Sequence, residues 1–245
     1  MGFNEETRQN IRSAGTTLPF ISGGVSTLPI PQVGYLARLH LHFTGTMTIT
    51  PGTGTVALSE KGPWNLFRKL RYQIGSGTEL YNVSGFGSHL VDACSRLAYV
   101  PEDGRVNAPY ASEIYSAPVV SGPNVWEFGL TIPIVPNERD IMGLILLQSE
   151  GTVTQLLAEW QSEAGPTTDY PIVATGNATA SMAGNLSVYL ETFTVPGDVT
   201  NQPPLTKIHQ ILERVDPIFA TGDNSIKLIK ENVYLRLIQS VEIGG

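Results

Sequence analysis

His40 and His42 are the residues of this chain whose spacing best fits a chemical site. They lie two positions apart in a segment that alternates apolar and polar residues, so both imidazoles are expected on one face of a β-strand. Two such histidines could give a transition metal two of its ligands. The neighbouring positions on that face are Arg38 and Thr44, and no nearby carboxylate completes a ligand set. We therefore expect this polar face to be buried between domains or subunits, without a metal.

His89, Asp92 and Cys94 form a second group, inside a helix expected over residues 86–98. Asp92 follows His89 by three residues and is its neighbour on the helix surface, whereas Cys94 lies on another face. A Cys–His nucleophile pair needs the two side chains within hydrogen-bond reach. We therefore expect Cys94 to be a small core residue. Because Cys94 is the one cysteine, an internal disulfide is excluded.

The other polar motifs also lack the spacing of an active site. No lysine of a phosphate loop follows the glycine-rich stretch 75–78. The basic cluster Arg68, Lys69 and Arg71 alternates faces on an expected strand, which favours a solvated or interface edge over a nucleic-acid groove. Several glutamates are scattered in loops without paired spacing: Glu60, Glu79, Glu102 and Glu113. We expect no catalytic, cofactor-binding or metal-binding residue, and no cofactor.

The composition favours protein–protein contacts over chemistry. Of the 245 residues, 41% are hydrophobic and only 15% are charged, which leaves much of the surface to neutral polar residues. The net charge of -7 argues against a general nucleic-acid binder. We find no apolar run long enough to span a bilayer and no signal peptide, so the expected product is a soluble chain made in the cytoplasm.

The two histidines lie in the segment 35–50, which is the strongest structural signal in the chain. Its odd positions are apolar apart from Gly45, and its even positions are polar after Leu36. This period of two predicts a β-strand with one buried face. At about 3.3 Å per residue the strand would be roughly 50 Å long, which suits a large sandwich with an architectural role.

The rest of the chain predicts an all-β fold in three parts. Residues 1–34 are expected to be an N-terminal helix over 3–14, ended by Gly15, followed by an extended arm without regular structure. Residues 35–196 are expected to form a jelly roll, an eight-stranded antiparallel sandwich with one inserted short helix. Residues 197–245 are expected to be a linker and the start of a second, partial jelly roll. Beyond 35–50, strand regions are expected at 67–74, 80–83, around 119–120, 126–134, 141–147, 152–160 and 186–195.

Several short motifs resemble the tectivirus-type double jelly-roll major capsid proteins of tailless icosahedral double-stranded DNA viruses, the lineage that includes the adenovirus hexon. The passage 58–66, with Gly62-Pro63-Trp64-Asn65, and the strand after it are similar to the family's strand–Gly-Pro-x-Asn-Leu–strand passage. Ser84-Gly85-Phe86 resembles its entry into a helix. Three further segments resemble the family: 132–140, the link 195–197, and 232–245 as an early strand of a second barrel.

This resemblance implies a structural protein and no enzyme. Members carry two upright jelly rolls in one chain, form pseudo-hexagonal homotrimers and coat an internal membrane. An N-terminal arm points toward that membrane and neighbouring capsomers, and residues 1–34 fit such an arm. The resemblance thus implies a virion location, with minor capsid proteins as possible partners. The alternatives are a jelly-roll binding module, such as a viral spike or lectin-like domain, and a cupin-like metalloenzyme that uses His40 and His42.

Overall fold

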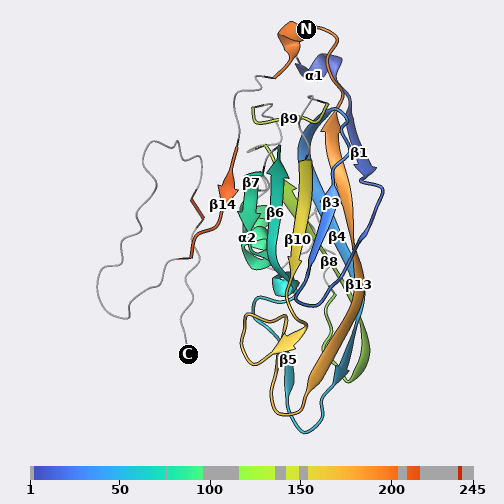
Figure 1. Ribbon diagram of the computed structural model, residues 1–245, viewed down its shortest axis with the longest axis vertical. Helices are drawn as coiled ribbons and strands as arrows, with labels where there is room; N and C mark the ends of the chain where they lie inside the picture. Colours follow the sequence, from blue (N-terminus) through green and yellow to red (C-terminus); the bar gives the residue numbers. More distant parts are fainter. Residues whose placement is uncertain are drawn as a thin grey trace, which may run out of the picture.

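Two β-sheets pack face to face in this chain (Figure 1). We describe it from a computed structural model that places residues 3–75, 77–95, 116–135, 142–148, 154–203, 209–215 and 237–238. The first sheet has the order β1 (Gln9–Ser13), β13 (Thr179–Phe193), β4 (Tyr35–Thr50), β8 (Gly122–Pro133), with β2 (Leu18–Pro19) beside β13 and β9 (Ile145–Leu146) beside β4. The second sheet has the order β14 (Ile211–Leu212), β7 (Thr78–Val83), β6 (Phe67–Ile74), β10 (Thr154–Trp160), β3 (Val25–Pro29).

The strand order is that of a jelly roll. Among the described residues, eight strands have five residues or more: β1, β3, β4, β6, β7, β8, β10 and β13. Numbered one to eight along the chain, they give the sheet orders 1-8-3-6 and 2-7-4-5, and all their pairings are antiparallel. This arrangement of two Greek keys confirms the predicted eight-stranded antiparallel sandwich. The inserted helix is α2 (Gly85–Ser95), between β7 and β8.

The long strand predicted from the alternation at 35–50 is confirmed as β4, over the same residues. It pairs with β13 on one side and with β8 on the other. Its apolar side chains are buried between the sheets, whereas Thr44, Thr46, Thr48 and Thr50 are exposed on the outer face. Gly45, the one gap in the apolar phase, lies opposite Gly184 of β13, and an added Cβ would approach the β13 backbone to 2.9 Å.

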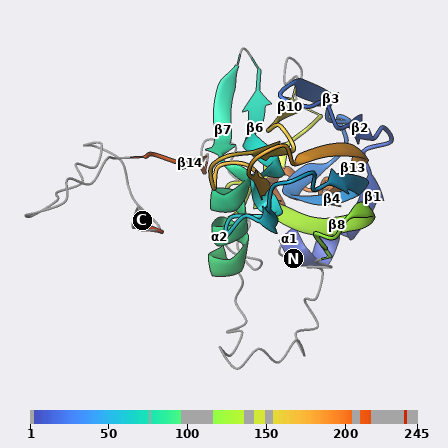
Figure 2. The ribbon, with the colours of Figure 1, turned by 90° about the horizontal axis from the view of Figure 1, so that it is seen from below.

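Aromatic side chains from both sheets meet in the core. Phe43 of β4 and Phe128 of β8 come from the first sheet, with ring centroids 5.2 Å apart. Phe67 of β6 and Trp160 of β10 come from the second, 4.9 Å apart. Phe43 also lies 5.9 Å from Trp160, so the cluster joins the two layers. Tilted and edge-to-face aromatic contacts of this kind add to the stabilisation from apolar burial. Figure 2 shows the two layers from below.

The prediction for the N-terminal 34 residues was wrong in its secondary structure. The helix α1 covers only Phe3–Glu6, and residues 9–13 form β1, whose backbone pairs along β13. The expected unstructured arm contains β2 and β3. Two of the eight main strands, β1 and β3, therefore precede residue 35. Pairing with distant strands outweighed the local helix and turn signals. The sandwich therefore begins near residue 9, and β4 is its third main strand.

Further hydrogen bonds show why residues 15–34 belong to the sandwich. The indole of Trp160 donates to the Ser26 hydroxyl at 2.9 Å, and that hydroxyl donates to the Pro19 carbonyl at 2.9 Å. Leu28 of β3 is buried in the main core. The polar and apolar contacts both fix β3 against β10.

The connecting segments follow the turn signals only in part. The turn at 62–66 contains the short 3-10 helix η1 (Trp64–Leu66) and leads into β6 as expected. A strand at 119–120 was wrong, because the Asn124 side chain binds both backbone groups of Val120 and holds a turn there. A small third sheet contains β5 (Val56–Leu58), β11 (Ala164–Gly165) and β12 (Ile172–Ala174).

The segment after β13 leaves the sandwich through the 3-10 helix η2 (Val199–Asn201) and reaches β14. The sequence also predicts a polar loop at 101–117 and a turn at 137–140. The loop up to residue 115, the turn and most of the expected second jelly roll fall outside the described residues. Within the described part of the chain, no helix combines the length and apolar character needed to cross a bilayer.

Candidate functional site

The polar face predicted around His40 and His42 is the outer face of the first sheet. Arg38, His40 and His42 alternate along β4 with the buried apolar residues. Register places Glu191 of β13 opposite Arg38, and Thr131 of β8 opposite His40. Side chains of three adjacent strands therefore meet on one surface.

Glu191 is the centre of this cluster. Its carboxylate accepts hydrogen bonds from Arg38 Nη1 at 3.0 Å, from His40 Nε2 at 2.9 Å and from Gln9 Nε2 of β1 at 2.6 Å. Its side chain is only 5% exposed, although it lies on the outer face. Burial by itself raises the pKa of this carboxyl, but the hydrogen bond from His40 and the attraction to Arg38 outweigh it, and the pKa is lowered. The cluster holds Glu191 charged.

His42 has a separate carboxylate partner. Its Nε2 lies 2.9 Å from Glu127 Oε1 of β8, and both side chains are about one-third exposed. The expectation that no carboxylate lies near the histidines was therefore wrong. The neighbouring strands β13 and β8 each place one carboxylate beside an imidazole. The two imidazoles point to different carboxylates. Among the described residues, no group of three or more His, Cys, Asp and Glu side chains could hold a metal ion.

Farther along β4 the same face becomes neutral. From Thr44 to Thr50 every outward side chain is an exposed threonine. Glu127 of β8 lies opposite Thr44. Beyond it the neighbouring outward residues are uncharged: Ser181, Ala183 and Asn185 on β13, and Pro123 and Val125 on β8. Val125 is 64% exposed. The uncharged part of this surface, from Thr46 to Thr50 and the residues opposite, suits contact with another protein surface, since no charged group has to be desolvated.

The helix α2 does not assemble a nucleophile. The ring of His89 stacks on Trp64 with centroids 3.6 Å apart, while the buried Asp92 carboxylate accepts from the Thr131 backbone N–H at 3.3 Å. Cys94 is exposed, so its prediction as a core residue was wrong. The reason is the orientation of the helix, which buries Ser88, Val91 and Asp92 against the sheet and leaves Ala93 and Cys94 outside.

The basic cluster on β6 is largely neutralised by acidic neighbours. Arg68 Nη2 contacts Glu159 Oε2 of β10 at 3.0 Å. Arg71 makes ion pairs with Glu159 and with Glu79 of β7. Because β6 is flanked by β7 and β10, the cluster is on the outer face of the second sheet and not at an edge. The paired carboxylates offset the charges of Arg68 and Arg71.

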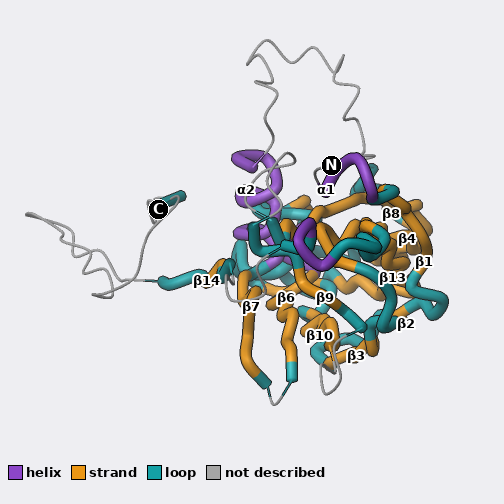
Figure 3. Tube along the Cα trace, turned by 90° about the horizontal axis from the view of Figure 1, so that it is seen from above, coloured by secondary structure: helices purple, strands orange, loops and turns teal. Residues whose placement is uncertain are grey.

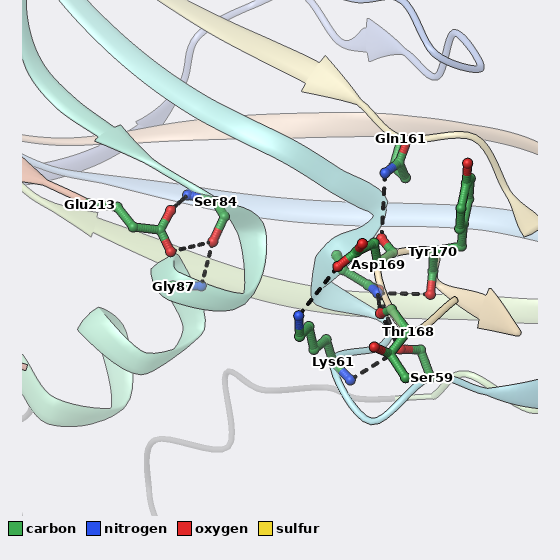
Figure 4. Close-up of polar contacts among 10 residues, drawn as sticks. Ser59, Lys61, Ser84, Gly87, Gln161, Thr168, Asp169, Tyr170 and Glu213 are labelled. Carbon is green, nitrogen blue, oxygen red and sulfur yellow. Dashed lines mark hydrogen bonds and ion pairs between the residues drawn. The ribbon is translucent and has the colours of Figure 1, made fainter. Parts of the chain in front are cut away.

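Asn65 of the Gly-Pro-Trp-Asn passage has a structural role. Its side-chain amide donates to the carbonyls of Thr168 and Tyr170, at 3.0 and 2.8 Å, and lies 3.3 Å from the Ser59 hydroxyl. Figure 4 labels the partners Ser59, Thr168 and Tyr170, which lie beside Lys61 and Asp169. The asparagine ties the start of β6 to the loop before β12.

Sequence reasoning missed the carboxylates that complete these clusters. Glu127 and Glu191 both lie in the polar phase of an expected strand, which is the one signal that marks them as outward-facing. The expectation that the chain has no catalytic, cofactor-binding or metal-binding residue stays a prediction. The candidate site is therefore the outer face of the first sheet, where the charged cluster and the exposed threonines lie.

No protein-family model matches the sequence. No curated protein matches it either. The fold is similar to the crystal structure of the STIV MCP, with a TM-score of 0.54 and 11% identity over 82% of this chain and 55% of that chain. It is also similar to a chain in the atomic structure of Sulfolobus Turreted Icosahedral Virus (TM-score 0.53, 10% identity, 79% of this chain, 47% of that chain). A third similar structure is PBCV-1 VP54, fitted into a reconstruction of the virophage Sputnik (TM-score 0.50, 15% identity, 79% and 44%).

These neighbours are double jelly-roll capsid proteins of icosahedral viruses. At such low identities the similarity establishes the fold, in agreement with the fold that the sequence motifs implied. The chain spans about half the length of the structures it matches.

Proposed function

We propose that this chain is a major capsid protein of a tailless icosahedral virus, or the first jelly roll of one. Its role would be to build a shell by contacts with copies of itself, without catalysis and without direct binding of nucleic acid. The proposed location is the virion, after synthesis in the host cytoplasm. The observation that carries the proposal is the jelly-roll strand order of the two facing sheets, supported by the similarity of the fold to that of the STIV MCP.

The surface chemistry supports the same role. A chain with a net charge of -7 repels its own copies at long range, so contacts between copies favour surfaces where no charge is desolvated. The threonine-rich part of the first sheet is such a surface. At the start of β4, the side chains of Arg38, His40 and His42 are already paired with carboxylates within the chain, so they need no external partner. We propose homotrimers and contacts with neighbouring capsomers as the mode of assembly.

The structure of the N-terminal region limits which of its residues could contact an internal membrane or minor capsid proteins. Phe3 packs against Tyr35 and Phe193, with ring centroids 5.9 and 5.6 Å away. The Glu6 carboxylate accepts from Asn201 Nδ2 at 2.9 Å. Residues 9–34 contribute strands to the sandwich, so the part available for such a contact is the end of the molecule that carries α1 (Figure 1). We propose that this end faces the shell interior.

Size-exclusion chromatography with multi-angle light scattering on the full chain tests the proposal. The expected result is a species of three times the 26.5 kDa chain mass, followed by negative-stain images of threefold particles. A monomer that binds glycans on an array would contradict the proposal in favour of a lectin-like or spike module. Stoichiometric transition metal in the purified protein would favour the cupin-like alternative.

A further inference from the structure

Glu213, just after β14, is bound by the turn that begins helix α2. Its Oε2 accepts a hydrogen bond from the Ser84 backbone N–H at 2.6 Å, and its Oε1 accepts from the Ser84 hydroxyl at 2.8 Å (Figure 4). These two residues are 129 positions apart in the chain. The segment that leaves the sandwich therefore returns to its surface and is held by a charge-assisted contact.

The start of α2 is shaped to accept this carboxylate. Ser84 caps the helix, since its Oγ accepts from the Gly87 N–H at 3.0 Å. A Cβ added at Gly87 would lie 2.7 Å from Glu213 Oε1, so glycine leaves the space that the carboxylate occupies. The positive end of the helix dipole also favours a negative charge here. The Ser-Gly-Phe-Gly turn thus combines two donors, a favourable field and room for one carboxylate.

Backbone pairing fixes the same segment independently. β14 runs parallel to β7, with Ile211 opposite Tyr81 and Leu212 opposite Asn82. The Glu213 N–H donates to the Asn82 carbonyl at 3.0 Å, and Gln210 Nε2 donates to the Glu79 carbonyl at 3.1 Å. These bonds cover part of the edge of the second sheet, which would otherwise expose unpaired backbone groups. Figure 3 shows β14, β7 and α2 together at one flank of the molecule.

We propose that the edge of β7 and the Ser84–Gly87 turn form a docking surface for the chain's own segment 209–215, with Glu213 as its latch. The latch fixes the flank from which the chain continues past Val215. Given the proposed function, on which this step rests, the second jelly roll would start beside β7 and α2 and not at the β3 edge. Leu212 and Val215, which are 56% and 86% exposed, then lie where the following domain would cover them.

Disulfide trapping in the full chain tests the docking. Asn82→Cys and Leu212→Cys, in a Cys94→Ser background, place two cysteines directly opposite each other on adjacent strands, within the usual Cα separation of a disulfide. Mild oxidation is expected to give an intrachain bond, seen by non-reducing mass spectrometry. As a matched control, Asn82→Cys with Val25→Cys is expected to give none, because β3 is at the opposite edge of the sheet.

The variant Glu213→Ala tests the latch. We expect the yield of the trapped bond to fall several-fold, and hydrogen exchange at the Ser84 and Glu213 amides to rise at least tenfold. Glu60→Ala, at another exposed glutamate, is expected to change neither. Absence of the intrachain bond, or bonds only between copies, would overturn the docking of this segment in its own chain. If light scattering shows no trimers while the intrachain disulfide still forms, only the proposed function is contradicted.

Discussion

The guanidinium of Arg38 and the carboxylate of Glu191 form an ion pair of 3.0 Å across β4 and β13. Their side chains are 14% and 5% exposed, so solvent screens the pair little. Removing Arg38 would leave the poorly solvated Glu191 carboxylate with only its hydrogen bonds from His40 and Gln9. The pair therefore has a larger effect on stability than an exposed one of the same length.

Arg38→Leu is expected to lower the free energy of unfolding by about 2–4 kcal/mol, measured by urea denaturation. Arg68→Leu, whose pair with Glu159 is more than half exposed on the arginine side, is expected to cost less than about 1 kcal/mol. The double variant Arg38→Leu/Glu191→Leu is expected to lose less than the sum of the two single variants. Additive effects would contradict a direct interaction.

The lowered pKa of Glu191 predicts an acid-sensitive step in stability. A carboxyl whose pKa is lower in the folded state than in the unfolded state stabilises the fold at pH values above its unfolded pKa of about 4.5. That contribution is lost as the pH falls through the folded pKa. In Glu191→Gln the unfolding midpoint in urea should therefore decline less between pH 5 and pH 3 than in the parent chain. Parallel pH profiles would show that Glu191 does not titrate as described.

The long strands were predictable because each buries one continuous face. The alternation at 35–50 predicted β4 to the residue, and the pattern from Trp126 to Ile134 predicted most of β8. β1 was missed because its residues are mostly exposed and its stabilisation comes from backbone pairing with β13. The pairing partner lies about 180 positions away, at the far end of the sandwich sequence, so no local pattern reports it.

The polar outer face of the first sheet could be predicted only for one strand at a time. The polar phase of β4 correctly placed His40 and His42 on the outer face. Their carboxylate partners depend on sheet order and register, which bring β13 and β8 to either side of β4. A shift of one residue in register would have placed Glu191 on the opposite face. The pattern of a single strand does not contain that information.

Leu28 tests whether the N-terminal region is part of the sandwich core. It is 2% exposed on β3, so Leu28→Ala should lower the free energy of unfolding by about 2–4 kcal/mol through lost apolar burial and a residual cavity. Val25→Ala on the same strand, where the valine is 47% exposed, should cost under about 1 kcal/mol. Urea denaturation measures both. Equal and small effects would indicate a detachable arm.

Asn65 is expected to determine the stability of the turn that precedes β6. Asn65→Ala removes both donors to the Thr168 and Tyr170 carbonyls and should cost about 2–3 kcal/mol. Asn177→Ala, at an exposed turn, is expected to stay within about 0.5 kcal/mol of the parent chain. Hydrogen exchange should rise in the 168–172 segment of the Asn65 variant only. An unchanged exchange pattern would contradict the role assigned to this side chain.

We expect that His40 and His42 do not bind a metal ion together. His40 and His42 direct their Nε2 atoms to carboxylates on opposite sides of β4, Glu191 on β13 and Glu127 on β8. A metal that used both imidazoles would have to break these two contacts, one of them largely buried. Addition of Zn²⁺ at a few equivalents should therefore leave the thermal unfolding midpoint unchanged within about 1 °C, whereas a site-bound ion would raise it by mass action. A large rise that disappears in His40→Ala would show that the pair binds metal after all.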